Sequence, residues 1–286
     1  MAAVNGYTRK GEWLETRSPL ESLPIPEPLL RRLRREGGLR ESGGRVLLRL
    51  FPEERGPYAA EWMPLDILYE DDFCLVVRKP AGMAVHPSST DGTGTLANAV
   101  AGHYEATGQE HKVRHIHRLD VDTTGPVLYA KNAFAHAVLD EAMREKRIER
   151  RYIAVVKGRP EPERGVIDLP IGKDRHHPQR RRVSRGGDRA VTRYETVQVL
   201  AGGTASVVRL QLETGRTHQI RVHLSHLGHP VWGDKLYGGP ASPHIPRQAL
   251  HGERLLFPHP WTGQQVEVHD PVPPDMLQLM ESLEKM

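Results

Sequence analysis

The residues best suited to chemistry lie in the segment HRLDVDTTG, residues 117–125. Asp120 stands there among hydroxyl side chains and ahead of a glycine, and the apolar run 127–130 follows. This order predicts a loop that leads into a buried strand and presents Asp120 from a rigid base. A carboxylate held in that way can act as a nucleophile or a general base. By spacing alone, however, an aspartate satisfied by backbone amides in a turn is the favoured interpretation.

The densest basic run is KDRHHPQRRRVSRGGDRAVTR, residues 173–193. Its arginines surround a proline and a Gly-Gly pair, with few apolar residues between them. The pattern predicts a long loop or hairpin that lies along a phosphate backbone, with Arg180, Arg181 and Arg182 at its centre. A loop that is merely solvated is the alternative.

A second group of donors lies in TGRTHQIRVH, residues 214–223. Arg216 and Arg221 carry planar forks of donors that suit paired recognition of carboxylate or phosphate, and His218 adds an imidazole. These three side chains are therefore predicted to bind an anionic partner or an acidic side chain.

Four histidines crowd a short stretch and raise the question of a metal site: His218, His223, His226 and His229. On a helix with about 100° per residue, His218 and His223 point about 140° apart and cannot share a metal, whereas His223 and His226 can. No zinc-binding pattern accompanies them. Packing or RNA contact is therefore favoured over a metal.

Several other chemistries are excluded. Residues 165–174 lack the glycine and hydroxyl of a phosphate-binding loop, and residues 92–94 lack the third glycine of a dinucleotide fingerprint. There is no G-x-S-x-G nucleophile elbow. The one cysteine, Cys74, lies in an apolar run, which predicts a buried strand residue and excludes an intramolecular disulfide.

The bulk composition sets broad limits. The chain has 286 residues, a net charge of +4 and 38% hydrophobic residues, which are ordinary values for a globular protein. The pI near 9.2 is compatible with a polyanionic partner. The start of the chain has no apolar stretch of signal-peptide length, and no window approaches a membrane span. We therefore expect a cytoplasmic protein with no membrane contact.

The elements that must position these residues can be read from periodicity. Residues 67–77 predict two strands around an acidic turn, and residues 152–156 predict a further strand. Helical spacing predicts a helix capped by Asn132, one from about His218 to Leu227, and a capped one from Asp275 onward. Strands and helices alternate irregularly, which favours an α+β fold over a βαβ repeat.

The first part of the chain has a different character. A proline-rich segment, residues 22–28, precedes a short basic helix at 29–35, and residues 45–51 predict a strand. The boundary is expected near residue 62, with a small N-terminal module at 1–62 and the main domain at 63–286.

Five segments resemble the RluA-type pseudouridine synthases. They occur in that family's order and cover most of the main domain. They are ILYEDDFCLVVRKPAGMAVHP (67–87), HRLDVDTTG (117–125), RYIAVVKG (151–158), TGRTHQIRVHLSHLGHPVWGDKLYG (214–238) and LHGERLLFPHP (250–260).

The resemblance implies a role for each matched residue. Asp120 corresponds to the catalytic aspartate, which attacks the target nucleoside so that uracil can detach, turn and rejoin the ribose through carbon 5. Tyr152 corresponds to the tyrosine that stacks on the uracil, and Arg221 to the basic residue paired with the aspartate. Arg118 corresponds to an arginine that holds the opened RNA, and Lys79 belongs to the same predicted RNA-binding set.

The implied fold is a mixed, mostly antiparallel β-sheet with flanking helices and a central RNA-binding cleft, and no cofactor. The chain departs from the family pattern at Thr124 and Pro126, where serine and an aliphatic residue are more usual, and at Arg78, where asparagine is usual. These departures leave the matched catalytic positions intact and bear only on subfamily and substrate. The N-terminal module weakly resembles the S4-type RNA-binding module, as a degenerate version or an unrelated cap.

The expected partner is RNA, ribosomal in preference to transfer RNA, with no obligatory protein partner evident. Two alternatives stay open at this level. One is an RNA-binding or ribosome-assembly protein without catalysis, for which the basic loops would suffice. The other is a metal-dependent RNA-processing enzyme that uses the histidines. Activity in excess chelator separates the metal enzyme from the synthase.

Overall fold

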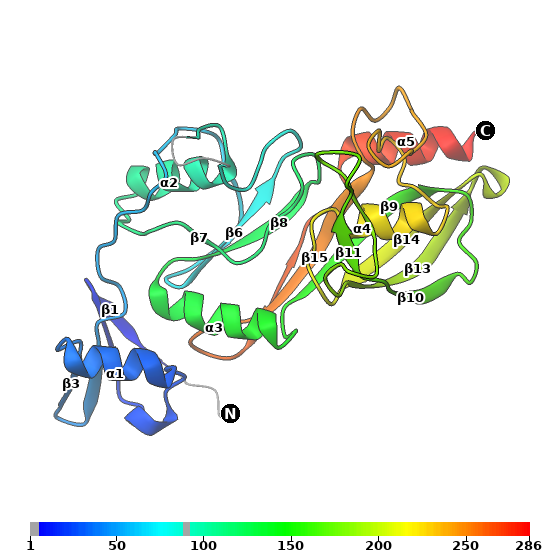
Figure 1. Cartoon of the computed structure of the whole chain (residues 1–286). Helices are drawn as coiled ribbons and strands as arrows, with labels where there is room; N and C mark the ends of the chain where they lie inside the picture. Colours follow the sequence, from blue (N-terminus) through cyan, green and yellow to red (C-terminus); the bar gives the residue numbers. More distant parts are fainter. Residues whose placement is uncertain (1–5, 88–91) are drawn as a thin grey trace.

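The structure is a computed structural model that describes residues 6–87 and 92–286. Residues 1–5 lie outside the described residues. They include the start of the predicted N-terminal module and of the segment predicted to lack a signal peptide. The described chain is elongated, with the N-terminal sheet at one end and the largest sheet at the other (Figure 1).

The N-terminal sheet has four antiparallel strands in the order β1-β2-β4-β3. Its elements are β1 (Thr8–Lys10), β2 (Trp13–Thr16), the 3-10 turn η1 (Leu20–Ser22), α1 (Glu27–Arg35), β3 (Leu39–Ser42) and β4 (Arg45–Leu48). The predicted basic helix is confirmed: Pro28 lies in its first turn, and the helix ends ahead of Gly37, whose φ is +69°. The predicted strand at 45–51 is shorter than expected, because the chain leaves the sheet after Leu48.

A second four-stranded sheet forms the middle of the molecule, in the order β5-β6-β8-β7. Its elements are β5 (Asp66–Glu70), β6 (Cys74–Lys79), α2 (Leu96–Ala106), β7 (Arg114–His115), β8 (Gly125–Ala130) and α3 (Ala133–Arg144). The two strands around an acidic turn are confirmed, and Cys74 is fully buried in β6. The predicted cap of α3 is confirmed too, because Asn132 Oδ1 accepts a 2.8 Å hydrogen bond from the Ala135 N–H.

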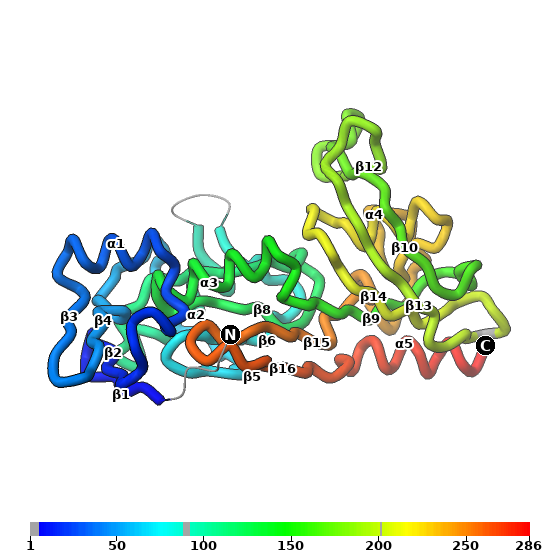
Figure 2. Tube along the Cα trace, turned by 90° about the horizontal axis from the view of Figure 1, so that it is seen from below, coloured from blue at the N-terminus to red at the C-terminus, as the bar shows by residue number. Residues whose placement is uncertain are grey.

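The largest sheet has six antiparallel strands in the order β10-β13-β14-β9-β15-β16. Its elements are β9 (Glu149–Lys157), β10 (Arg164–Asp168), β13 (Val191–Leu200), the 3-10 turn η2 (Ala201–Gly203), β14 (Ala205–Leu212), β15 (Leu250–Pro258) and β16 (Gln265–His269). Helix α4 (Gln219–His226) covers one face, and α5 (Pro274–Glu284) covers the other (Figure 2). The basic run is a hairpin, as predicted: β11 (Ile171–Lys173) pairs with β12 (Arg181–Val183) and projects from the body beside α4.

Two details of the predicted helices differ. The helix predicted to run to about Leu227 ends at His226, and Leu227 is its C-cap and is 39% exposed, because the chain turns away at Gly228. Helix α5 is preceded by Pro273 and has no side-chain cap. The α+β class is confirmed, and all ladders between named strands in the described residues are antiparallel. A parallel bridge between Thr124 and His251 joins the middle sheet to the largest one.

The N-terminal sheet shares a hydrophobic core with the middle sheet. Leu14 and Leu48 of the first sheet are fully buried in one cluster with Phe73 and Trp261. The rings of Phe73 and Trp261 stack with centroids 6.1 Å apart and planes 3° apart. Each such buried side chain contributes roughly 1.5–3 kcal/mol. The N-terminal sheet is therefore packed onto the main body and not merely tethered to it.

In the described residues, no helix is both long and apolar enough to span a membrane.

Candidate active site

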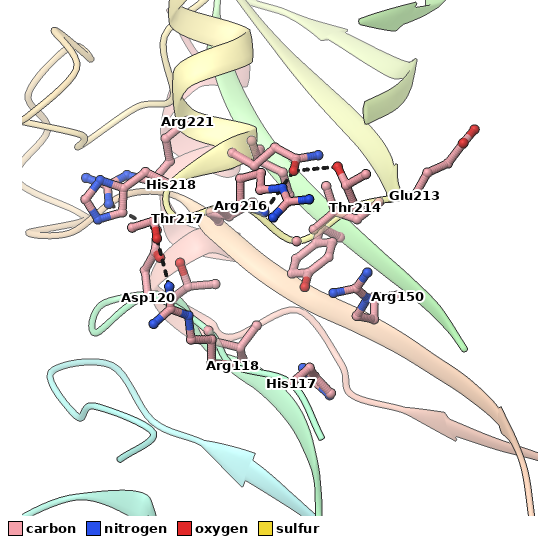
Figure 3. Close-up of a pocket in the computed structure, with 18 of the residues that line it drawn as sticks. His117, Arg118, Asp120, Arg150, Glu213, Thr214, Arg216, Thr217, His218 and Arg221 are labelled. Atoms are coloured by element: carbon pink, nitrogen blue, oxygen red, sulfur yellow. Dashed lines mark hydrogen bonds and ion pairs between the residues drawn. The ribbon is translucent and has the colours of Figure 1, made fainter. Parts of the chain in front are cut away.

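A cleft lies where the loop before β8 meets the start of α4. It has two hollows, of about 390 Å³ and 650 Å³. The two hollows share six lining residues: Arg118, Leu119, Asp120, Thr217, His218 and Arg221. Arg118 Nη2 donates a 2.7 Å hydrogen bond to Thr217 Oγ1, which crosses from one wall to the other. Figure 3 shows the Arg118 and Asp120 side chains facing Thr217 and His218 across this cleft.

The loop that carries Asp120 is held by buried donors on several sides. The Thr123 N–H donates to the Asp120 carbonyl at 3.1 Å and closes a turn. Lys79 Nζ donates to the Val121 carbonyl at 2.6 Å, and Arg247 Nη1 donates to the Asp122 carbonyl at 3.2 Å. These contacts tie the loop to both sheets, so the carboxylate of Asp120 projects from a fixed backbone.

The glycine that ends this loop is required by a close approach. Gly125 has φ +134°, and a Cβ there would stand 2.7 Å from the carbonyl oxygen of Gly252 on β15. The Gly252 N–H also donates to the Thr124 carbonyl at 2.8 Å. A side chain at position 125 would therefore push the two sheets apart below the cleft.

Two of the departures from the family pattern belong to one buried network beneath this loop. Thr124 Oγ1 lies 2.8 Å from His251 Nδ1, and His251 Nε2 lies 3.0 Å from the Asp270 carbonyl. Arg78 Nε donates to Asp270 Oδ1 at 2.6 Å. Thr124 and Arg78 thus support the same His251–Asp270 unit, and neither one enters the cleft as a lining residue.

Arg221 on α4 binds two carboxylates at once. Its Nη1 donates to Asp120 Oδ2 at 3.1 Å, while its Nε and Nη2 donate to the two oxygens of Asp234 at 2.6 and 2.9 Å. Burial acts to lower the pKa of Arg221, but the hydrogen bond and charge of Asp234, joined by the charge of Asp120, outweigh it and raise the pKa. Arg221 therefore stays cationic and directs one N–H of its fork at Asp120.

Sequence reasoning missed Asp234, which is 1% exposed. Its carboxylate also accepts the N–H groups of Leu236 and Tyr237, at 3.1 and 3.2 Å. The residue lay within the matched segment 214–238, but nothing in its local spacing indicated a partner 13 residues earlier. Only the turn after Val231 brings it beneath α4.

Tyr237 was missed as well, although it touches three parts of the site. Its ring centroid lies 5.0 Å from Arg221 Cζ, and its hydroxyl lies 2.8 Å from His218 Nδ1. The same hydroxyl accepts the Arg181 N–H at 2.9 Å. Tyr237 therefore connects the basic hairpin to the arginine that faces Asp120.

Tyr152 lines the same hollow as Asp120 and Arg221. It lies on β9, is 4% exposed, and burial raises the pKa of its hydroxyl. The three side chains predicted to be catalytic are thus brought together around one cavity.

The predicted RNA-binding residues divide into groups. Arg118 and Arg216 are exposed at the rim, and Arg216 Nε donates to the Arg189 carbonyl at 3.1 Å. His218 precedes α4 in the left-handed conformation, with φ +59°. Arg181 lines the larger hollow.

The two other arginines of the hairpin lie apart from the cleft wall. Arg182 is exposed, and Arg180 stacks over the Tyr237 ring with its Cζ 5.7 Å from the ring centroid. Arg180 and Arg181 are therefore connected to the cleft, whereas Arg182 is exposed on the hairpin without a contact to the cleft lining.

The prediction that Lys79 contacts RNA is wrong. Its side chain is fully buried, and its ammonium group donates to the carbonyls of Pro80, Met83 and Val121. Burial lowers the pKa of Lys79 to about 7, although Asp122 and Asp120 nearby oppose this. All three of its N–H groups are used inside the protein, so Lys79 supports the Asp120 loop from below.

The histidines of α4 do not converge. His223 is fully buried and contacts Thr192 Oγ1 and the Leu169 carbonyl, both at 2.9 Å. His218 instead faces the cleft. Within residues 6–87 and 92–286, no group of three or more His, Cys, Asp or Glu side chains stands close enough to hold a metal ion.

Buried His117 predicts a loss of stability in acid. Burial lowers its pKa to about 3, whereas an unfolded histidine has a pKa of about 6.5. Below pH 6.5 the unfolded chain therefore binds more protons than the folded one, and stability falls by up to about 1.4 kcal/mol per pH unit. Urea unfolding at pH 7 and pH 5 should show the wild type losing about 2 kcal/mol more than His117→Gln. The exposed His244→Gln serves as the control and should follow the wild type.

Comparison with known proteins identifies the family to which the chain is similar. Residues 73–226 match the family model described as RNA pseudouridylate synthase. The RNA pseudouridine synthase YhcT of Bacillus subtilis is 47% identical over 84% of this chain and 79% of its own length. Ribosomal large subunit pseudouridine synthase D of Vibrio parahaemolyticus is 40% identical over 85% of this chain and 78% of its own.

Solved structures agree on the fold. Human RNA pseudouridylate synthase domain containing 4 superposes with a TM-score of 0.62 at 24% identity, over 76% of this chain and 92% of that one. Human RNA pseudouridylate synthase domain containing 1 gives a TM-score of 0.59 at 26% identity, over 78% and 96%.

The fold and the matched residues together define an enzyme that modifies RNA. The chain belongs to the RNA pseudouridylate synthase family, whose members isomerise uridine in RNA to pseudouridine. The resemblance to RluA-type synthases is thereby confirmed.

Proposed function

We propose that Asp120 is the nucleophile of this synthase. Arg221 keeps the Asp120 carboxylate ionised and fixes its orientation, and the ring of Tyr152 stacks on the displaced uracil. The observation that carries this proposal is the 3.1 Å contact between Arg221 Nη1 and Asp120 Oδ2, made inside a cavity that Tyr152 also lines. Lifting a base from its stack costs a few kcal/mol, and stacking on an aromatic ring offsets roughly 1–3 kcal/mol of it.

The chemistry is an isomerisation that conserves the number of bonds. Asp120 attacks C1′ of the ribose, the C1′–N1 bond breaks, and its electron pair leaves with the uracil. The uracil turns, C5 bonds to C1′ as the aspartate leaves, C5 loses its proton, and N1 gains one. The exchange is balanced within the nucleoside, so no energy source is required.

We propose ribosomal RNA as the substrate, acted on in the cytoplasm. Support comes from the several relatives named ribosomal large subunit pseudouridine synthase D, each about 40% identical to this chain. The experiment is site mapping of pseudouridine in total RNA from cells with and without the gene. Loss of a site in ribosomal RNA supports the proposal, whereas loss confined to transfer RNA contradicts it.

We propose further that the N-terminal module, residues 1–62, contacts RNA outside the cleft. Its helix α1 exposes Arg31, Arg32, Arg34 and Arg35. A module fixed by a shared core would hold these arginines at a constant distance from Asp120. Replacing all four arginines with Gln should weaken RNA binding. It should not change the rate at which bound RNA is converted to product.

The hairpin arginines supply a separate prediction about binding. Replacing Arg180, Arg181 and Arg182 with Ala should weaken RNA affinity and flatten its dependence on salt, because each lost phosphate contact lowers the slope by about one unit. Affinity measured by filter binding between 50 and 200 mM salt tests this. Exposed Arg144 of α3, changed to Ala, is the control, and an unchanged slope in the triple variant would show that the hairpin is merely solvated.

A further inference from the structure

Arg150 is a buried cation to which the described protein offers no partner. It lies on β9, is 9% exposed, and its Nε is buried without a hydrogen-bond partner among the described residues. Every other deeply buried arginine near the site is paired: Arg221 with Asp234, and Arg247 with Asp275. A buried charge is costly unless an opposite charge or a set of acceptors meets it. The guanidinium of Arg150 is therefore left available to an acceptor that does not belong to the described protein.

The cavity that Arg150 lines offers no carboxylate to it. Of the described lining residues, only Asp120 and Glu213 carry carboxylates. Asp120 is bound to Arg221, and Glu213 is bound to Lys146 at 2.9 Å and Arg193 at 2.6 Å. Gly215 lies against the guanidinium, and a Cβ there would stand 3.0 Å from Arg150 Nη1. The wall beside the guanidinium is thus kept free of a side chain.

His117 adds a second unpartnered donor to the same cavity. The Leu128 N–H donates to His117 Nε2 at 3.2 Å, so this nitrogen carries no proton. Burial and the nearby charge of Arg150 lower the pKa of His117 to about 3, so the ring is neutral and its one proton is on Nδ1. That Nδ1 is buried and has no partner among the described residues. Arg150 and His117 therefore line the same cavity, and each has one buried nitrogen for which the described residues offer no acceptor.

We propose that Arg150, assisted by His117 Nδ1–H, binds a carbonyl oxygen of the target uracil and stabilises the negative charge that the base carries once it is detached. This inference rests on the proposed roles of Asp120 and Tyr152. When the C1′–N1 bond breaks, the electron pair stays on the uracil and spreads over N1 and the two carbonyl oxygens. A preorganised cation in a site shielded from water acts on such a charge most strongly.

The position of Arg150 favours the base over the RNA backbone. Arg150 and Tyr152 are two residues apart on β9, so their side chains leave the same face of the sheet. Tyr152 is the platform proposed for the uracil. Arg118 and Arg216 are exposed at the rim of the cleft, whereas Arg150 is buried. Figure 3 shows all three side chains. A base that enters the cavity reaches Arg150, and the backbone stays outside.

The test compares Arg150→Met with Arg151→Met. Arg151 is the next residue on β9, points to the opposite face and pairs with Glu149, so it is a matched control. The probe is a large-subunit ribosomal RNA transcript carrying 5-tritiated uridine, followed under single-turnover conditions. We expect Arg150→Met to slow the maximal rate of tritium release by about 100-fold, with RNA affinity and its salt slope unchanged. His117→Gln should give a smaller loss in the same parameter, and Arg150→Lys should restore part of the rate.

A second readout separates function from structure. Because Arg150 has no partner in the free protein, Arg150→Met should leave the melting temperature unchanged or raise it. A fall in melting temperature together with lost activity would identify a structural role and overturn the inference. A weaker affinity with a reduced salt slope and an unchanged maximal rate would identify a phosphate contact and overturn it as well. If Asp120→Asn is inactive while Arg150→Met is fully active, only this inference fails; if Asp120→Asn is active, the proposed catalytic centre fails.

Discussion

Asp120→Asn is expected to abolish tritium release from 5-labelled uridine in RNA, with a loss of at least roughly 10⁴-fold, the scale seen when a nucleophile is removed. The amide keeps the shape of the side chain and can still accept a hydrogen bond from Arg221. It cannot form the bond to C1′ that displaces the uracil. RNA affinity should stay within several-fold of the wild type, because the rim and hairpin arginines are unchanged.

The control for this experiment is Asp140→Asn. Asp140 is an exposed residue of α3 that pairs with Arg144 and does not line the cleft, and its change should leave release unaltered. Full activity of Asp120→Asn would contradict the assignment of the nucleophile. Complementation of a synthase deletion by the same variant would instead support a protein that acts by binding alone.

The sequence predicted the elements well where one local pattern decides the structure. Asn132 caps α3 because its side chain and the helix start are neighbours in the chain, and the acidic turn before Cys74 is likewise local. The extent of the strand at 45–51 was wrong because tertiary packing, not propensity, draws Leu50 and Phe51 into the core shared with Phe73. The local spacing of residues does not show whether tertiary packing or strand propensity decides where a strand ends.

The reactive residues of the site could be predicted from the sequence. The residues that hold them in place could not. The matched segments led to Asp120, Tyr152 and Arg221, and the structure brings them to one cavity. Lys79 was misassigned because its place in a matched segment does not tell whether its side chain is exposed, whereas its ammonium group is enclosed by carbonyls. Whether a charge faces solvent or the interior depends on contacts distant in sequence, such as the one from Lys79 to Val121.

Among the residues that hold the reactive side chains in place, Asp234 is the one whose substitution is expected to change activity most. It holds two of the three Arg221 nitrogens, so Arg221 reaches Asp120 from a fixed direction. Asp234→Ala should leave the guanidinium buried with one partner, which costs about 3–5 kcal/mol of stability in comparable buried pairs. Asp234→Asn keeps the volume but turns an amide N–H₂ toward the guanidinium. The variant should fold, and its kcat should fall by about 100-fold with KM nearly unchanged. The reason is that the orientation and charge of the Asp120 carboxylate matter most in the transition state.

Asp275→Asn is the matched comparison for Asp234→Asn. Asp275 binds Arg247 through the same two-point geometry, at 2.7 and 2.9 Å, and Arg247 contacts the Asp120 loop at the Asp122 carbonyl and not at the Asp120 carboxylate. Urea unfolding measures what each pair contributes to stability, and single-turnover release measures what it contributes to the reaction. If both variants lose stability but only Asp234→Asn loses kcat, the second carboxylate acts through Arg221 on the nucleophile. Equal losses of kcat would mean that any weakening of the cleft walls slows the enzyme, and Asp234 would then be a structural residue only.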